Sequence, residues 1–182
     1  MQIIILNGVG SVGKTTTART LQAIAREPFL HVAMDAFIDM LPATMFGHPE
    51  GLTFETVLEA GEPSVVIRTG PVFERVMRGM RHAIAAMAAQ GNCLIVDEVM
   101  IGQGEALEYR ELLADYPVRL VGLFAPLEVL EARERDRGDR QLGLARWQFD
   151  RVHRDISYDL AIDASASTPL EIAGKIRDAF GL

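Results

Sequence analysis

The chain has 182 residues, of which 49% are hydrophobic and 24% are charged, and it carries a formal net charge of −7. This length and composition predict one globular domain spanning residues 1–182, and the acidic balance argues against nucleic acid as a partner. Cys93 is the single cysteine, which excludes an internal disulfide or a cysteine metal cluster and suits the reducing cytoplasm. No leader peptide and no membrane-spanning stretch is recognised, so we expect a cytoplasmic protein.

Apolar runs typical of strands alternate with helical stretches along the chain. The predicted strands are residues 2–6, 30–34, 93–96, 118–124 and 160–162. The clearest predicted helices are residues 15–26, 73–89, 126–135 and 169–180, the last with Thr168 as its N-cap. This alternation predicts an α/β fold of three layers, in which helices cover both faces of a five-stranded parallel sheet. A ligand then binds at the carboxyl ends of the strands.

A glycine-rich segment follows the first strand and opens the first helix. It matches the phosphate-binding loop pattern GxxxxGKT, whose backbone amides, helix terminus and lysine together hold a polyphosphate. In this setting the pattern predicts a P-loop NTPase or kinase fold; the alternative is a glycine turn that only links strand to helix. The predicted nucleotide-binding residues are Gly8, Val9, Gly10, Ser11, Val12, Gly13, Lys14, Thr15 and Thr16. Lys14 is also a catalytic candidate because its ammonium can follow the transferring phosphate, and the hydroxyl of Thr15 can hold Mg²⁺.

Two acidic residues end the third predicted strand. Asp97 directly follows residues 93–96, the position at which a carboxylate lies beside the Mg²⁺ of a phosphate-binding loop. We predict Asp97 as the second metal ligand with Thr15. A buried strand that merely meets a polar loop would have the same sequence, and Glu98 is the less certain of the two.

Asp35 follows the second predicted strand, at the mouth where a nucleotide and an acceptor meet. A carboxylate there can accept a proton from an acceptor hydroxyl and orient its oxygen toward the terminal phosphoryl group. Asp35 is therefore predicted as a catalytic and acceptor-binding residue. The alternative is an N-cap on a helix that starts near Phe37.

An inserted segment at residues 42–71 interrupts the alternation and is too apolar for a linker. We predict that it forms a lid over the acceptor, and the alternative is ordinary core packing of its hydrophobic residues. With neighbouring side chains it would make an adaptable apolar wall for an aromatic or greasy alcohol. The predicted wall consists of Phe37, Ile38, Phe46, Phe54 and Met100, with Met34 beside them. Arg68, Arg75 and Arg78 would instead favour an anionic acceptor if they faced inward.

An arginine-rich segment at residues 133–144 is predicted to form a second lid, over the nucleotide. Arg133 and Arg137 lie one helical turn apart, so one guanidinium can stack on the base while the other reaches the phosphates. Arg140, beyond a glycine, can clamp the transferring group. The alternative is a solvated face, in which the interleaved acidic residues pair with these arginines.

Several of these segments together resemble chloramphenicol phosphotransferase, in the same order and over nearly the whole chain. They are residues 7–15, 34–39, 95–99, 133–140, 152–153 and 158–159, and Asp163. The resemblance implies a kinase fold, ATP and Mg²⁺, and phosphorylation of a primary hydroxyl on the antibiotic. It also implies that Asp35 is the catalytic base and Lys14 a phosphate ligand.

The sequence thus predicts an ATP-dependent O-phosphotransferase with chloramphenicol or a similar hydroxylated antibiotic as acceptor. A metabolic or nucleotide kinase, similar to shikimate or nucleoside monophosphate kinases, is the alternative enzyme, because residues 43–72 match the family only loosely. A nucleotide-binding switch protein is an alternative of another class. It is disfavoured because the NKxD motif of guanine-nucleotide switches does not occur and Asp97 does not begin their DxxG motif.

Overall fold

A five-stranded parallel sheet forms the centre of the molecule in the computed structural model, which describes residues 1–138 and 141–182. Its strand order is β2-β5-β1-β6-β7, and every neighbouring pair is parallel. The strands are β1 (Ile3–Asn7), β2 (Phe29–Ala33), β5 (Cys93–Glu98), β6 (Val118–Phe124) and β7 (Leu160–Asp163). The predicted α/β fold with a five-stranded parallel sheet is confirmed.

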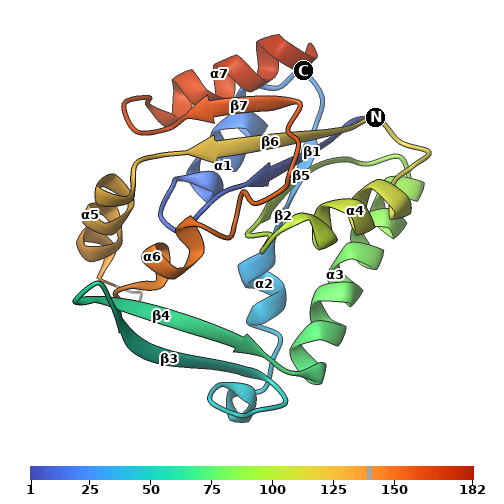
Figure 1. The fold of residues 1–182 in the computed structure, drawn as a ribbon. Helices are drawn as coiled ribbons and strands as arrows, with labels where there is room; N and C mark the ends of the chain where they lie inside the picture. Colours follow the sequence, from blue (N-terminus) through green and yellow to red (C-terminus); the bar gives the residue numbers. More distant parts are fainter. Residues whose placement is uncertain (139–140) are drawn as a thin grey trace.

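Helices cover both faces of this sheet (Figure 1). One face packs against α1 (Lys14–Ile24) and α7 (Pro169–Phe180), and the other against α3 (Pro71–Ala89) and α4 (Gln103–Leu112). Three further helices are short or peripheral. α2 (Met34–Ile38) follows the carboxyl end of β2, α5 (Leu127–Arg137) follows that of β6, and α6 (Leu144–Phe149) comes after α5 in the chain. None of the helices in the described residues has the length and hydropathy to span a membrane.

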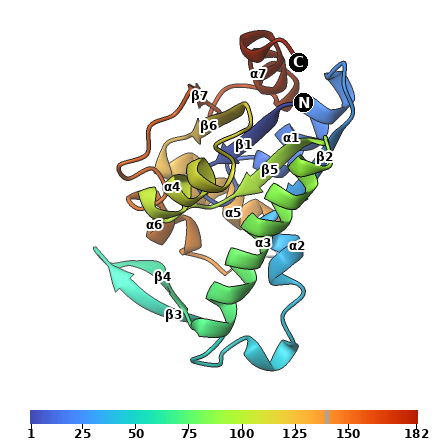
Figure 2. The same cartoon turned by 90° about the vertical axis from the view of Figure 1, so that its right-hand side faces the viewer.

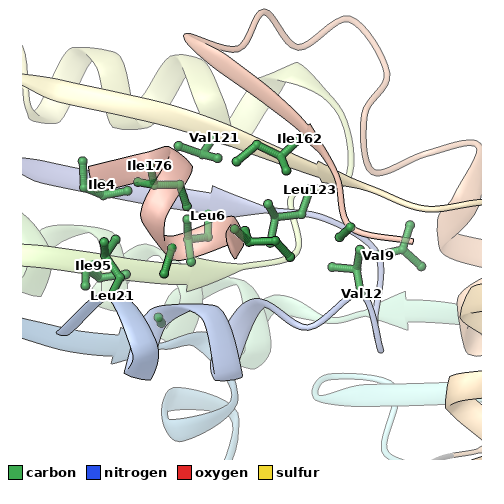
Figure 3. Packing of buried hydrophobic residues seen from close by; sticks show 14 of the residues in the cluster. Ile4, Leu6, Val9, Val12, Leu21, Ile95, Val121, Leu123, Ile162 and Ile176 are labelled. Atoms are coloured by element: carbon green, nitrogen blue, oxygen red, sulfur yellow. The ribbon is translucent and has the colours of Figure 1, made fainter. Parts of the chain in front are cut away.

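The period of two in β1 explains how the sheet supplies two cores. Ile4 and Leu6 point to the face of α1 and α7, whereas Ile3 and Ile5 point to the face of α3 and α4. Figure 3 shows Ile4 and Leu6 packed among apolar side chains of neighbouring strands and helices. Side chains buried on both faces are the mark of a central parallel strand, and they fix the position at which β1 ends and the glycine loop begins.

The inserted segment is more ordered than the sequence suggested. After a 3₁₀ turn, η1 (Ala43–Met45), it forms an antiparallel hairpin of β3 (Leu52–Glu59) and β4 (Glu62–Thr69). Figure 2 shows this hairpin beside the N-terminal end of α3, apart from the five-stranded sheet. The turn uses Ala60 and Gly61, both with positive φ, as two-residue hairpin loops require. Neither this hairpin nor α4 was predicted.

The C-terminal helix begins as the sequence predicts. The Thr168 hydroxyl accepts a hydrogen bond from the Glu171 amide, and the Glu171 carboxylate accepts one from the Thr168 amide, which completes a capping box. α7 packs against α1, the helix that follows the glycine loop.

We expect Thr168→Ala to lower the free energy of unfolding by about 1 kcal/mol, since it removes the side-chain acceptor of the cap. Urea unfolding followed by circular dichroism measures this. Ser167→Ala is the matched control, because Ser167 lies next to the cap and bonds only the carbonyl of Asp163 and Lys175. Equal losses in the two variants would contradict the capping role.

Candidate functional site

The glycine loop between β1 and α1 has the shape of a phosphate cradle. Gly13, the residue before α1, has a φ of 103°, a conformation that favours glycine. Gly8 approaches β6 so closely that an added Cβ would lie 2.8 Å from the carbonyl oxygen of Leu123. The two glycines therefore let the chain turn sharply and lie close against the sheet, directly before the positive end of an eleven-residue helix.

Two side chains, those of Lys14 and Gln148, hold this loop by its backbone. The Lys14 ammonium donates to the carbonyl oxygens of Gly8 at 2.7 Å and Val9 at 3.2 Å. The Gly10 amide donates to the Gln148 side-chain oxygen at 2.7 Å. These partners satisfy polar groups that would otherwise be buried without a hydrogen bond.

Asn7, the last residue of β1, connects the loop to two neighbouring segments. Its side chain accepts from the Met100 amide and donates to the Val152 carbonyl and the Tyr158 hydroxyl. His153 completes this network through its 2.7 Å contact with Tyr158, and burial and the charge of Lys14 lower the pKa of His153 to about 4. The imidazole is therefore neutral at physiological pH, as a packing residue rather than a proton carrier.

Thr15 and Asp97 meet at the start of α1. The Thr15 hydroxyl donates to Asp97 Oδ2 at 2.6 Å, and His31 Nε2 lies 3.6 Å from the same oxygen. Burial raises the pKa of Asp97, but His31, the charge of Lys14 and the Thr15 hydroxyl outweigh burial and hold it below its usual range. The carboxylate is thus ionised at neutral pH, beside a hydroxyl, as a hard-cation site requires.

Asp35 shares a cavity with most of the predicted nucleotide-binding residues. It lies in the first turn of α2, immediately after β2, which pairs with β5 so that Ala33 is opposite Asp97. The sheet thus brings the two aspartates to one edge although they are far apart in sequence. The lining residues of the cavity are Gly10, Ser11, Gly13, Lys14, Thr15, Thr16, Met34, Asp35, Asp97, Glu98, Val99 and Arg137. The other loop residues, Gly8, Val9 and Val12, are buried behind it.

Arg133 and Arg137 of the arginine-rich segment have different surroundings. Arg133 donates to the carbonyl oxygens of Ala164 at 2.9 Å and Ser165 at 3.1 Å, and it approaches the Val12 carbonyl at 3.4 Å. It therefore joins the end of β7 to the loop, while Arg137 lines the cavity. Arg140 lies outside the described residues.

The acidic residues interleaved with these arginines have other partners. Glu131 pairs with Arg146 at 2.6 Å. The buried Glu134 accepts the amides of Gly143 and Ala145. Glu131 and Glu134 therefore bond residues at the start of α6, and these bonds involve neither Arg133 nor Arg137.

The predicted acceptor wall is only partly assembled. Phe37 and Ile38 are half-buried and pack against a small cluster that includes Leu41, Phe73 and Met77. The aromatic rings of the inserted segment, Phe46 and Phe54, are 43% and 42% exposed. None of these four residues lines the cavity around Asp35 in this conformation.

Met100 is a correction to the predicted wall. Its exposure is 0%, and it lies in the core between the sheet and α3 and α4. The strand that carries Asp97 ends at Glu98, and the backbone amide of Met100 is then held by the Asn7 side chain. This bond turns Met100 inward, so it cannot contact an acceptor.

The three arginines that could have bound an anionic acceptor lie on the surface. Arg68 is exposed on the hairpin and pairs with Glu55 at 3.3 Å. Arg75 and Arg78 are exposed on α3. The cations that line the described cavity are therefore Lys14 and Arg137.

Glu98 is a residue of the cavity for which the sequence predicted no role. It is 2% exposed, with Arg81 of α3 at 3.8 Å from Oε1 and Glu108 of α4 on the other side of that arginine at 2.7 Å. Burial raises the pKa of Glu98 to about 7, although Arg81 opposes the shift. Its position after Asp97 was visible in the sequence, but its partners come from two helices that no local pattern connects to it.

We expect Glu98→Gln to remove a pH-dependent loss of stability. The pKa of Glu98 rises from 4.5 to about 7 on folding, so the folded protein binds this proton more tightly, and the stabilisation is lost as pH rises from about 4.5 to 7. The neutral amide escapes this loss. The variant should match the wild type at pH 4.5 and exceed it at pH 8 by up to about 3 kcal/mol in the free energy of unfolding.

Denaturant unfolding at the two pH values measures this difference. Glu111→Gln, on an exposed residue of α4, is the control and should shift stability alike at both values. If the difference between Glu98→Gln and wild type were the same at pH 4.5 and pH 8, Glu98 would not take up a proton on folding.

Comparison with known proteins agrees with this geometry. A protein provisionally named O-phosphotransferase, found in two strains of Mycobacterium tuberculosis, is 29% identical over 98% of this chain and 82% of its own length. Among solved structures, the Deinococcus radiodurans tunicamycin resistance protein has a TM-score of 0.68 at 21% identity, over 100% of this chain and 96% of that one.

Kinases share the same fold. A sugar kinase from Janibacter sp. has a TM-score of 0.67 at 18% identity, covering 100% and 95% of the two chains. Shikimate kinase from Aquifex aeolicus has a TM-score of 0.58 at 17% identity, covering 100% and 96%. The family model described as chloramphenicol phosphotransferase-like protein matches residues 1–181. The chain therefore belongs to the chloramphenicol phosphotransferase-like family and has the fold of P-loop kinases.

Proposed function

We propose that this protein transfers the terminal phosphoryl group of Mg·ATP to a hydroxyl of an uncharged small molecule, with chloramphenicol or a similar hydroxylated antibiotic as acceptor. The family already gives a phosphotransferase of the P-loop kinase class. The observation that supports the finer proposal is that Asp35, Lys14, Thr15, Asp97 and Arg137 line one cavity.

The residues around Thr15 and Asp97 fit a magnesium ion. In phosphate sites Mg²⁺ keeps several waters and takes only one or two protein oxygens together with the phosphates. The hydroxyl and ionised carboxylate 2.6 Å apart match this demand, and the described residues contain no cluster of three acidic, histidine or cysteine side chains that would make a larger metal cage. When bound, the ion would neutralise charge on the phosphates.

The loop amides and Lys14 would hold the phosphates, and Lys14 would leave its carbonyl partners to follow the transferring group. Asp35 would accept a hydrogen bond from the acceptor hydroxyl, and this bond would orient the hydroxyl oxygen in line with the terminal phosphoryl group. The Asp35 carboxylate would take up the hydroxyl proton as the new O–P bond forms and the bond to ADP breaks. Arg137 would stabilise charge on the transferring group, with Arg140 as its proposed companion, and Arg133 would support the base. The roles proposed for Asp35, Lys14 and Arg137 follow the positions of these residues around one cavity.

The charge of the cavity favours an uncharged acceptor. Its described carboxylates are Asp35, Asp97 and Glu98, and its described cations, Lys14 and Arg137, are the groups proposed for the phosphates. An acceptor with its own carboxylate or phosphate would meet the charge of Asp35 and Asp97, and the described lining offers it no further cation. Phe37, Ile38, Phe46 and Phe54 are the proposed apolar wall, which the hairpin would complete by moving inward.

We expect Asp35→Ala to lower kcat for acceptor phosphorylation by at least 100-fold, because the hydroxyl loses its orienting base, while the Kd for Mg·ATP changes less than threefold. Steady-state assays and calorimetry measure the two quantities. Asp39→Ala, one helical turn away and exposed, is the control and should keep normal turnover. Normal turnover in Asp35→Ala would remove Asp35 from the mechanism.

We expect Lys14→Met to lower phosphate transfer by about 100-fold or more, since it removes the cation nearest the phosphates while keeping the length of the buried side chain. Circular dichroism must show that the variant is folded, because Lys14 is only 7% exposed. An unchanged rate in the folded variant would contradict the phosphate role.

The acceptor is tested with Mg·ATP against a panel of chloramphenicol, other hydroxylated antibiotics, sugars, shikimate and nucleoside monophosphates. We expect a transferred phosphate on chloramphenicol or a similar antibiotic, detected by mass spectrometry. Activity confined to shikimate or a nucleotide would replace the antibiotic by a metabolic acceptor, and Mg·ATP binding without transfer to any member would favour a switch protein.

A further inference from the structure

Helix α6 touches the phosphate loop at one end and the hairpin at the other. Near its C-terminal end, Gln148 is 4% exposed and its side-chain oxygen accepts the Gly10 amide at 2.7 Å. No local sequence pattern explains a buried glutamine at this position. Gln148 thus supplies the acceptor for a loop amide 138 residues away in the chain.

The other end of α6 is fixed to the hairpin through Gly143. Its carbonyl oxygen accepts the Val65 amide of β4 at 2.9 Å, and its own amide donates to Glu134 at 2.8 Å. Gly143 has a φ of 97°, and an added Cβ would lie 2.6 Å from the Pro63 carbonyl oxygen. Hairpin and helix therefore meet backbone to backbone, with no room for a side chain.

The same hairpin and the helix that carries Asp35 contact one small apolar cluster. Leu52 and Ile67 belong to or pack against the cluster of Phe73 and Met77, and Met34 and Phe37 of α2 contact that cluster. A movement of the hairpin toward an acceptor would therefore change its contacts with the cluster that α2 also touches and with the residue before α6.

We propose that Gln148 is a positioning residue that ties the shape of the phosphate loop to the position of the hairpin. This rests on the proposed function in one respect, that the loop binds Mg·ATP. When the hairpin is in place, α6 presents Gln148 to Gly10, and the loop holds the form that accepts phosphates. When the hairpin is displaced, Gln148 withdraws and the loop loses a buried hydrogen bond.

A double-mutant cycle on nucleotide affinity tests this without any acceptor. The probe is Mg·AMP-PNP, with its Kd measured by calorimetry. Gln148→Met keeps the length of the side chain but cannot accept the Gly10 amide, and we expect its Kd to rise about tenfold. Gly143→Ala forces the hairpin and α6 apart, and we expect a rise of about fivefold. The double variant should bind no more weakly than Gln148→Met alone, because both changes break one connection.

Two further variants separate this role from simple structural support. Gln148→Glu keeps an acceptor oxygen at the same reach, so Gly143→Ala should still weaken binding in that background, even though the added charge repels the triphosphate. Arg151→Met is the control, since the Arg151 side chain donates to the Trp147 carbonyl and stacks on the Trp147 ring, and the Kd of this variant should equal that of the wild type.

Additive losses in the double variant, or an unchanged Kd in Gln148→Met, would overturn the proposal. If Gly143→Ala does not fold, Gln141→Ala takes its place, because Gln141 bonds Thr56 of β3 and is exposed. A wild-type protein that does not bind Mg·AMP-PNP would overturn the proposed function as well. A protein that binds the nucleotide but does not phosphorylate chloramphenicol would leave this inference standing and remove only the acceptor.

Discussion

The site depends on a loop whose shape is held by hydrogen bonds to neighbouring side chains before any anion arrives. The buried side chains of Val9 and Val12 anchor this glycine-rich turn in the core, but without hydrogen-bond partners the backbone between them would sample many shapes. Here Lys14 bonds two loop carbonyls, Arg133 approaches a third, and Gln148 accepts the Gly10 amide. The ordering cost of the cradle is thus largely met on folding, which leaves more of the phosphate contacts for binding.

The parallel sheet turns this local order into a shared site. Because β1, β2 and β5 run in the same direction and pair in register, Asn7, Ala33 and Asp97 reach one edge together. The side chains that follow them come from segments far apart in sequence, yet they need no long side chains to meet. Asp35 and Thr15 lie beside Asp97 for this reason, and the apolar alternation of the strands on both faces fixes the arrangement.

Much of this could be predicted from sequence because it follows from local patterns. The glycine loop, the strand before Asp97 and the capping box at Thr168 each depend on residues close together in the chain. The hairpin was missed because β3 and β4 are mostly exposed, so no clear apolar alternation marks them. Met100 was misplaced because its direction is set by the Asn7 side chain, 93 residues away.

The roles of Glu134 and Gln148 illustrate the same limit. In the sequence Glu134 is one charge in an alternating run, and its duty, holding the amides that begin α6, depends on the return of the chain. Gln148 is an ordinary polar residue in a short helix until Gly10 is brought beside it. Long-range hydrogen bonds between a side chain and a backbone group leave no periodicity for a sequence to display.

β3 and β4 pair with each other, and neither joins a strand of the central sheet in the described part of the chain. The exposed side chains of this hairpin can therefore be exchanged in the course of evolution without disturbing the strands that carry the phosphate chemistry. On the proposal that the hairpin covers the acceptor, relatives would differ in their acceptors through changes in these side chains, while the sheet and the glycine loop stay the same. Exchange of the hairpin between relatives is then a practical route to enzymes with new acceptor preferences, provided that Gly143, which contacts the hairpin backbone, is kept.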